Sequence, residues 1–503
     1  MKKNTAILIN ERGEINFDEL SLSPVMSENV ELIKNLFEGD AMLRTRECKN
    51  AFNPEIHCTL FFMDGMANSE LVDGSIAKPL VEMIAPPCET ESVADFIAEK
   101  VLYAGEVKKS GDVSLIAKSL SYGDTVVFAE GASEALIVNS KGWATRGVEQ
   151  PENEKNLRGP KEGFTESLLM NTGLIRRKLK TPDLKFEMMS IGTRSNTGVC
   201  ICYLKSLASD EVLKTLKERM KKIEIDGILD TNYIDELTRD NPYTPFKTAG
   251  VTERPDVVAA NLLEGKIAVI VDGSPSVMTV PYLLIESLQS DDDYYLNYYF
   301  ASIGRLLRII SLLITTITPA FYIALVAFHK EMIPKNLALS ISAAREGVPF
   351  PITVECIIML TVFELLRESG VRMPSNVGAA LSIVGAIVIG QAAVDAKFVS
   401  APMVIIVSMT GITGLMVSKL KGVVILYRLL LVILASVLGM YGLIFGLMFM
   451  VAHAASLTSY GVRYTSFISG KKIQEIKDIY LRLPWKIMKT RPVNIAKNLV
   501  RKN

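Results

Sequence analysis

Cysteine, histidine and net charge are the features in which this chain is poor. Its 503 residues include six cysteines and three histidines, and the formal net charge is zero. Cysteines without paired spacing fit a reducing compartment, and histidines this dispersed suggest no metal cluster. We interpret Cys200 and Cys202 as two small core thiols on one face of a strand. The sequence therefore predicts neither a metal site nor a bound cofactor.

Catalytic motifs are missing as well. The sequence contains no phosphate-binding loop, no nucleophile elbow and no histidine or cysteine constellation at ligand spacing. Several acidic residues lie close together in the sequence, and we expect them to form a solvent-exposed helix face: Asp226, Asp230, Glu236 and Asp240. We therefore predict that the chain is not an enzyme, and we expect no nucleic-acid partner.

Apolar residues, by contrast, are abundant and unevenly distributed. They make up 49% of the chain, but up to about residue 299 the sequence is that of an ordinary soluble α/β protein. From about residue 303 to 455 it is dominated by apolar runs near the ~20 residues that span a bilayer. No secretory signal is recognisable, so we expect the first half to stay cytosolic. Residues 461–503 are basic, as expected of a cytosolic tail near anionic lipid.

The first half contains an internal repeat at an offset of about 142 residues. Residues 59–71 align with 201–213, and each is a β-rich run followed by a turn and helical periodicity. Later in each copy a hairpin closes at a glycine, Gly131 or Gly273, where a tight turn needs positive φ. The repeat predicts strand, helix, helix and hairpin in each copy, which is a small sheet covered by helices.

These patterns divide the chain into a cytosolic region and a membrane region. We predict an α/β cytosolic region of two similar subdomains followed by an α-helical multi-span membrane domain. The expected parts are a flexible N-terminal segment (1–27), a first α/β subdomain (28–148), a linker (149–163), a second α/β subdomain (164–290), a helical membrane domain (299–455) and a basic cytosolic tail (461–503).

The membrane domain offers five candidate segments, 302–328, 350–374, 377–394, 399–420 and 423–455. If the soluble half and the tail are both cytosolic, the number of crossings must be even, so one candidate should not span. The last segment is longer than one perpendicular crossing needs, and it must tilt, break or project. Glycines of the third and fifth segments are expected to let helices approach closely: Gly378, Gly385, Gly390, Gly439, Gly442 and Gly446.

Charged side chains within these segments are the strongest functional signal, because a charge at mid-bilayer costs a few kcal/mol and usually faces water or a partner. Arg305 and Arg308 lie one turn apart at the start of the first segment, where we expect them to snorkel to the headgroups. The second segment, which is the weakest candidate for a span, contains our candidate ion-path or gate residues: Glu355, Val362, Glu364, Leu366, Arg367 and Glu368.

Two interpretations of this second segment stay open. It is either an interfacial helix whose charges lie at the headgroups, or a helix that lines a polar path, where carboxylates favour cations and an apolar ring such as Val362 or Leu366 gates by dewetting. Glu364 and Arg367 can pair at i,i+3, which leaves the other two glutamates as the better candidates for contact with ions. A symmetric oligomer would supply the ring that one helix cannot make alone.

A series of motifs between residues 191 and 412 resembles the A subunits of spore germination receptors, the GerA family. The motifs are RSNT (194–197), DGILD (226–230), TERPD (252–256), LEG (263–265), DGSP (272–275), QSDDDYY (289–295), HKEMIP (329–334), AREGVPFP (344–351), FELLRESGVRMP (363–374) and SIVGAIVIGQAAV (382–394).

The resemblance implies a multi-pass inner-membrane protein of an endospore-forming bacterium. It implies a transporter-like B subunit that senses the nutrient and a C-subunit lipoprotein as partners, a homo-oligomer of this chain, contact with membrane lipids, and release of monovalent cations. The alternatives are a scaffold that does not conduct, or a paralogue of the receptor subunit. A secondary transporter would show inverted hydropathy repeats, which this sequence lacks.

Overall fold

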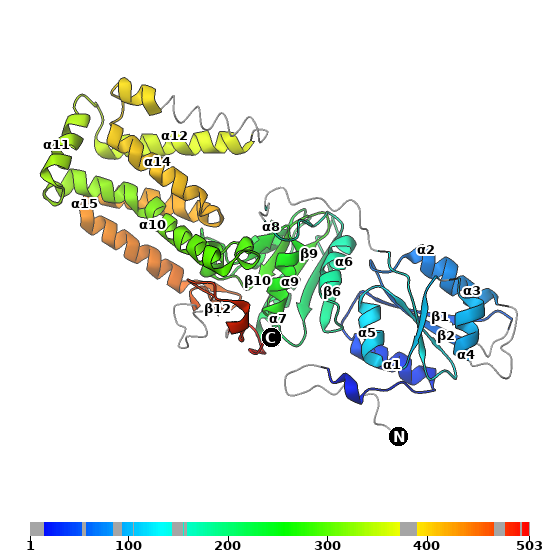
Figure 1. Ribbon diagram of the computed structural model, residues 1–503. Coiled ribbons are helices and arrows are strands. Elements are labelled where there is room, and N and C mark those ends of the chain that lie inside the picture. Colours follow the sequence, from blue (N-terminus) through cyan, green and yellow to red (C-terminus); the bar gives the residue numbers. More distant parts are fainter. Residues whose placement is uncertain are drawn as a thin grey trace.

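The computed structural model describes residues 15–52, 57–83, 93–103, 105–142, 154, 158–372, 390–466, 478–492 and 495–501. Two α/β units follow one another along the chain, a helical region extends from the second unit, and the C-terminal tail returns to that unit (Figure 1).

The first unit is built on a five-stranded antiparallel sheet of order β1-β2-β4-β5-β3. Its strands are β1 (Leu43–Lys49), β2 (His57–Met63), β3 (Val107–Ser110), β4 (Thr125–Ala129) and β5 (Ala135–Val138). The sheet is buried on both faces, because alternate side chains of one strand point to opposite sides. In β4, Val126 and Phe128 face one hydrophobic core while Val127 and Ala129 face another.

Helices cover both faces of this first sheet. Helices α1 (Met26–Leu36) and α5 (Val113–Ser121) supply apolar residues to one core. The other core is closed by the π-helix η2 (Val72–Ala77), which continues the short helix α2 (Ser69–Leu71), and by α3 (Lys78–Glu82), α4 (Val93–Phe96) and the π-helix η3 (Ile97–Val101). Before α1, the short helix η1 (Phe17–Glu19) and Leu22 pack against the first core, so ordered packing begins ahead of residue 28.

The second unit repeats this strand order, as β6-β7-β9-β10-β8. Its strands are β6 (Leu184–Ile191), β7 (Thr197–Leu204), β8 (Gly250–Thr252), β9 (Ile267–Val271) and β10 (Val277–Val280), and its helices are α6 (Leu168–Lys178), α7 (Asp210–Lys221), α8 (Thr231–Thr238) and α9 (Pro255–Leu263). The two predicted hairpin glycines, Gly131 and Gly273, have φ of +79° and +85°. The predicted internal repeat is therefore visible as a repeated strand order, while the subdomain boundaries stay a prediction.

The two faces of the second sheet contact different parts of the protein. The face covered by α6 and α9 belongs to the same core as the first unit. Cys200 and Cys202 are buried there as core thiols, and burial raises the pKa of both. The face covered by α7 and α8 shares its core with Val417 and Tyr427 of the helical region and with Tyr464 near the tail. The second unit thus connects the first unit to the helices.

The helical region contains α10 (Tyr298–Phe328), α11 (Lys335–Ala344), α12 (Ile352–Arg372), α14 (Ala401–Leu415) and α15 (Lys421–Ser456), with short helices η4 (Leu284–Leu288), η5 (Asp291–Tyr294), η6 (Lys330–Met332) and η7 (Ser418–Leu420) at the joints. Among the described residues, two helical stretches are long and apolar enough to cross a membrane, Tyr298–Phe328 and Ser418–Ser456. Helix α14 is apolar but shorter.

Helix α15 reverses direction at Gly439, whose φ of 59° and ψ of −133° lie outside the helical range. Tyr427 and His453 are hydrogen-bonded across the two halves, and a Cβ placed on Gly446 would collide with Leu431. Residues 421–438 and 440–456 are therefore two antiparallel arms, each about 26 Å long at 1.5 Å per residue. We expected this long segment to tilt, break or project, and the structure shows that it breaks.

The other helices run lengthwise between two ends of the bundle, a near end beside the second unit and a far end beyond it. Thr315 of α10 donates to the carbonyl of Thr410 in α14 at 2.9 Å, and Ser311, earlier in α10, contacts Met416, later in the chain, so these two helices are antiparallel. The reversal at Gly439 lies against Phe328 at the far end of α10. Helix α11 also lies at the far end (Figure 1).

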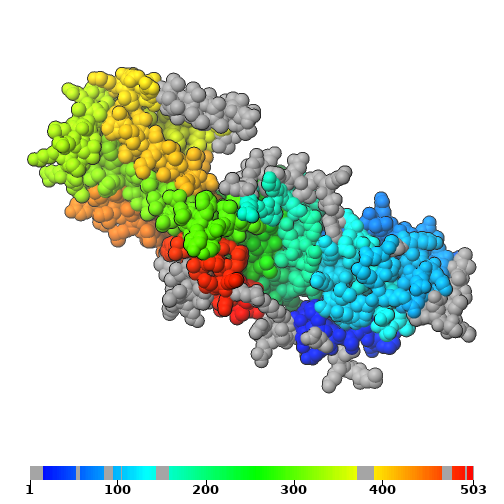
Figure 2. Space-filling view, viewed as in Figure 1, coloured from blue at the N-terminus to red at the C-terminus, as the bar shows by residue number. Residues whose placement is uncertain are grey.

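The tail packs against the second unit at the near end. It forms a two-stranded ribbon, β11 (Thr458–Ser459) and β12 (Val462–Arg463), and a short helix η9 (Trp485–Ile487), and Ala496 bridges to Ala208. In the space-filling view the tail (red) lies against the start of α10 and the second unit (Figure 2). Several of its cations bind that unit, including Lys497, which pairs with Asp210 at 2.6 Å. The two α/β units and the tail therefore lie at one end of the helices.

Candidate functional site

Two arginines at the start of α10 bind the last acidic segment of the second unit. Arg305 is almost fully buried, and its Nε donates to Asp293 Oδ2 at 2.9 Å. Arg308 donates to both oxygens of the same carboxylate, at 3.0 and 2.5 Å, and to the carbonyl of Leu288 at 2.7 Å. The expected snorkelling to headgroups is thus wrong for this pair, because a buried carboxylate offers these guanidinium groups shorter, charge-assisted hydrogen bonds.

The tail joins the same cluster through Asp478. Arg305 Nη1 donates to the Asp478 carbonyl at 2.6 Å and to its Oδ1 at 2.8 Å. Tyr294 donates its hydroxyl to Oδ2 at 2.7 Å, and burial, followed by the Asp478 carboxylate, raises the Tyr294 pKa well above its usual value. The second unit, the first long helix and the tail therefore meet in one network around the buried pair of Asp293 and Arg305. We call this network the junction: Asp293, Tyr294, Arg305, Arg308 and Asp478.

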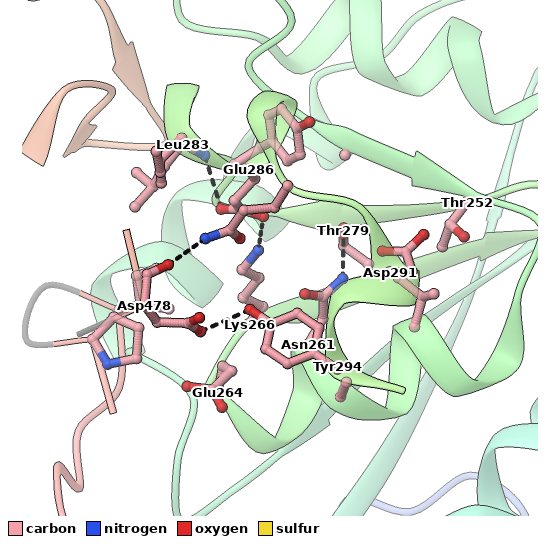
Figure 3. A pocket seen from close by; sticks show the side chains of 18 of the residues that line it. Thr252, Asn261, Glu264, Lys266, Thr279, Leu283, Glu286, Asp291, Tyr294 and Asp478 are labelled. Carbon is pink, nitrogen blue, oxygen red and sulfur yellow. Dashed lines mark hydrogen bonds and ion pairs between the residues drawn. The ribbon is translucent and has the colours of Figure 1, made fainter. Parts of the chain in front are cut away.

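A cavity of about 550 Å³ lies beside the junction, between the second unit and the tail (Figure 3). Its lining comes from β8, α9, η4 and the tail, and includes Tyr294 and Asp478 of the junction. Lys266 is buried in it and pairs with Glu286. The volume is within the range of small-molecule sites, and the lining carries both signs of charge with tyrosine rings. The cavity thus has the size of a small-molecule site, with charged groups on a lining whose surface is otherwise mostly apolar.

The charged helix α12 is held to α15 by Glu364. Its Oε1 accepts from Arg428 Nη2 at 2.6 Å, and its Oε2 pairs with Arg367. Arg428 is almost fully buried, so this carboxylate neutralises a cation within the helical region. The predicted i,i+3 pair of Glu364 and Arg367 is confirmed, but it is half of a three-residue cluster. One turn further, Lys421 lies 3.8 Å from Glu368.

Glu355, at the other end of α12, is completely buried at the far end of the bundle. Its Oε1 accepts from the backbone N–H of Ser400 at 2.6 Å and from its hydroxyl at 2.5 Å. Ser400 is the N-cap residue of α14, so this carboxylate meets the positive end of that helix. Arg345 Nε lies 3.7 Å from Glu355 Oε2. These contacts show that α12 runs lengthwise in the bundle, from Ser400 at one end to Lys421 at the other.

One face of α12 is open in the single chain. Residues at alternating spacings of three and four along the helix are exposed, as on one side of an α-helix: Val354, Ile358, Thr361, Leu365 and Glu368. The opposite side packs on α10, α14 and α15 through Cys356, Met359 and Leu360. The Glu368 side chain is 51% exposed, which makes it the most accessible carboxylate of the helix.

Comparisons with known proteins identify the family. Residues 31–494 match the family described as Bacillus/Clostridium GerA spore germination protein. The chain belongs to the GerA family. It is 39% identical over 478 residues to Spore germination protein KA of Bacillus subtilis (strain 168), covering 95% of this chain and 88% of that protein.

Other GerA relatives are similar over nearly the same span. Uncharacterized membrane protein YfkQ of Bacillus subtilis (strain 168) is 38% identical over 494 residues, covering 98% of this chain and 95% of YfkQ. Spore germination protein GerLA of Bacillus cereus is 34% identical over 482 residues, covering 93% and 97%. A crystal structure of the N-terminal domain of the A subunit of the Bacillus megaterium germinant receptor GerK3 is similar at 31% identity, with a TM-score of 0.41 over 52% of this chain and 97% of that domain.

The predicted packing glycines of this GerA chain have different surroundings. Gly378 and Gly385 lie outside the described residues. Gly390 is buried, and a Cβ there would reach Val404 at an ordinary 3.6 Å. Gly442 and Gly446, in contrast, lie where the two arms of α15 meet, and a Cβ on either would collide with the other arm. These two glycines therefore allow the two arms of α15 to approach each other closely, and both arms come from one predicted segment, 423–455.

The remaining predicted gate residues, Val362 and Leu366, are half-buried on α12 between its open and packed faces. Sequence reasoning missed Ser400 and Arg428, because their partners lie 45 and 64 residues away along the chain. It also missed the junction, although Asp293 and Arg305 are only 12 residues apart. The acidic run in QSDDDYY next to Arg305 and Arg308 was a usable signal for the junction. Asp240 was also misjudged: it accepts from Tyr460 and Gly461 of the β11–β12 turn at 3.2 and 3.3 Å instead of solvating a helix face.

Proposed function

We propose that this chain is a subunit of a nutrient-responsive spore germination receptor in the spore inner membrane. Membership of the GerA family supports this role, and α10 and α15 have the length and composition of membrane spans. The two α/β units and the tail would then lie in the cytosol. From the family resemblance, the partners would be a transporter-like B subunit, which senses the nutrient, and a lipoprotein C subunit.

We further propose that several copies assemble so that α12 lines a path for monovalent cations. The open face of α12 is the observation that carries this proposal, because the opposite face is occupied within the chain. A single helix cannot enclose a path, whereas copies related by rotation place the same face around one axis. Glu368 would attract cations at one end of this face, and Leu365 would narrow it by excluding water.

The other charged residues of α12 would position the helix without contacting the ions. Glu364 is engaged by Arg367 and Arg428, and Glu355 by Ser400. Both carboxylates therefore hold α12 at a fixed rotation about its axis. In this proposal Val362 and Leu366 border the path. The junction would transmit movement of the second unit to α10.

The reactivity of an introduced cysteine tests whether the open face of α12 contacts water or is covered by lipid or protein. In a chain whose Cys88, outside the described residues, is replaced by serine, Leu365→Cys should react with a charged, water-soluble thiol reagent in the assembled receptor. Leu360→Cys, on the packed face one turn away, is the matched control and should not react. If neither cysteine reacts, α12 faces lipid or protein and the path is excluded.

Ion flux tests the path itself. The full chain is reconstituted in liposomes with its partner subunits, and potassium release is measured after nutrient addition. Glu368→Gln should lower the flux and leave the melting temperature unchanged, whereas Glu364→Gln should lower the melting temperature because it leaves Arg428 buried without its carboxylate. Equal flux from Glu368→Gln and the unmodified receptor would contradict the role given to Glu368.

A scaffold that does not conduct is the alternative. It is favoured by the apolar character of most of the open face, since Val354, Ile358 and Leu365 would also suit lipid or a partner's helix. The scaffold predicts no potassium release under any activating condition, and no reaction at Leu365→Cys. The two experiments above therefore decide between the two functions.

A further inference from the structure

A second, smaller cavity lies at the far end of the helical region. Its volume is about 220 Å³, and it is formed where the last turn of α10 meets η6 and α11. The residues that line it are Val326, Lys330, Ile333, Ala338, Ile341, Ser342 and Arg345. Four of these seven residues are apolar, and two cations and one hydroxyl are the polar side chains.

The charge of this cavity is positive and poorly compensated. Both charged residues of the lining are cations, and within the part of the chain that the structure describes no carboxylate lies at ion-pair distance from Lys330. Arg345 has Glu355 at 3.7 Å, which is too long for a hydrogen bond, and the Arg345 Nε atom is buried without a hydrogen-bond partner. The better-placed oxygen of Glu355 is occupied by Ser400. An anion bound here would compensate Lys330 and give Arg345 the hydrogen bond that Glu355 does not supply.

The cavity lies at the level where the two apolar arms of α15 join, at the far end of the bundle. The reversal at Gly439 contacts Phe328 and His329, and Lys330 follows directly. Around the cavity, Met332 and Leu337 expose large apolar side chains, 63% and 53% respectively. In a membrane-embedded chain this is the depth of the lipid headgroups in the leaflet opposite the soluble units, with apolar surface on the acyl side.

We propose that this cavity binds the phosphate of an anionic phospholipid in that leaflet. Lys330 and Arg345 would hold the phosphate oxygens by charge-assisted hydrogen bonds, Ser342 would donate a further one, and the apolar walls would receive the start of the acyl chains. The lipid would tie η6 and α11 to the end of α10, next to Glu355 and hence next to the start of α12. This inference rests on the membrane location in the proposed function, but not on conduction.

Native mass spectrometry of the purified full chain in detergent tests the proposal, with phosphatidylglycerol, phosphatidylcholine or inorganic phosphate added as the probe. The unmodified chain should retain phosphatidylglycerol preferentially. Lys330→Gln should weaken this retention at least about tenfold, because one hydrogen bond to a charged group is lost. Ala338→Phe, which fills the cavity without changing its charge, should have a similar effect.

Lys335→Gln is the matched control, because Lys335 is an exposed lysine of α11 outside the cavity lining, and it should retain phosphatidylglycerol like the unmodified chain. A melting curve of each variant checks that it is folded. Equal retention of both lipids, or unchanged retention by Lys330→Gln, would overturn the proposal. Displacement of the lipid by an equal concentration of inorganic phosphate would show a free-anion site and would overturn it too. Flux is not part of this readout, so a chain that retains lipid but releases no potassium would contradict conduction alone.

Discussion

Tyr427 and His453 form a hydrogen bond between Oη and Nδ1, although 26 residues of one apolar run separate them. The Phe246 ring of the second unit contacts both, at centroid distances of 5.8 and 5.6 Å. This contact is possible because the chain reverses at Gly439. The near ends of both arms therefore contact the same ring of the second unit.

Replacing Gly439 by alanine should destabilise the protein, because φ of 59° with ψ of −133° is accessible to glycine and strained for other residues. We expect a loss of about 1 to 3 kcal/mol, seen as a lower melting temperature in detergent. Gly422→Ala is the control, since a Cβ on Gly422 meets open space in the first arm. A melting temperature of Gly439→Ala equal to that of Gly422→Ala would contradict the reversal.

Asp293→Asn should disrupt the junction, because the buried Arg305 and the half-buried Arg308 lose their shared carboxylate. Removing one partner of a buried ion pair costs about 3 to 5 kcal/mol. We expect a lower melting temperature and faster proteolysis of the tail at its lysines and arginines. Asp64→Asn breaks the exposed pair with Arg44 and should change stability by about 1 kcal/mol or less. Similar melting temperatures for the two variants would argue against a buried junction.

Gly265→Ala should detach the tail. Its Cβ would lie 2.8 Å from the Cα of Ala496 and 2.8 Å from the Leu207 carbonyl oxygen, which accepts from Lys497. Gly273→Ala is a close control, because the φ values of the two glycines are +88° and +85° while a Cβ on Gly273 meets open space. Limited proteolysis should cleave the tail faster in Gly265→Ala than in Gly273→Ala. Equal rates would mean that the tail does not rest on this glycine.

Lys185 should make the stability of the protein depend on pH. Burial lowers its pKa to about 8, while its ammonium donates to the Leu36 carbonyl at 3.0 Å. Between this pKa and the value near 10.5 in the unfolded chain, the unfolded state binds more protons, so stability rises with pH. From pH 7.5 to 9.5 the gain should be about 1 to 2 kcal/mol relative to Lys185→Met, measured by thermal unfolding.

The control for this titration is Lys214→Met, which removes an exposed lysine whose ion pair with Glu218 is 4.0 Å long. Its stability should follow that of the unmodified chain over the same pH range. A difference between the unmodified chain and Lys185→Met that stays constant with pH would show that Lys185 does not titrate in this window.

Local patterns predicted much of the fold but little of the candidate site. The repeated hairpins at Gly131 and Gly273 were predictable because a tight turn imposes a glycine and flanking β-rich runs within a few residues. The pair of Glu364 and Arg367 was predictable because helical geometry places i and i+3 together. Arg428 was not, because 64 residues separate it from Glu364 and helix packing brings the two together.

The sequence by itself determined the division into a soluble and an apolar half, the repeated α/β unit and membership of the GerA family, because these depend on composition and order along the chain. The tertiary structure decided which charges are buried with a partner and which stay accessible to solvent. It engaged Arg305 with Asp293 and buried Glu355 against Ser400, and it left Glu368 on the open face of α12. The reason is physical: whether a charge pairs or meets solvent depends on the surface that packs against it, and in this chain that surface comes from distant segments.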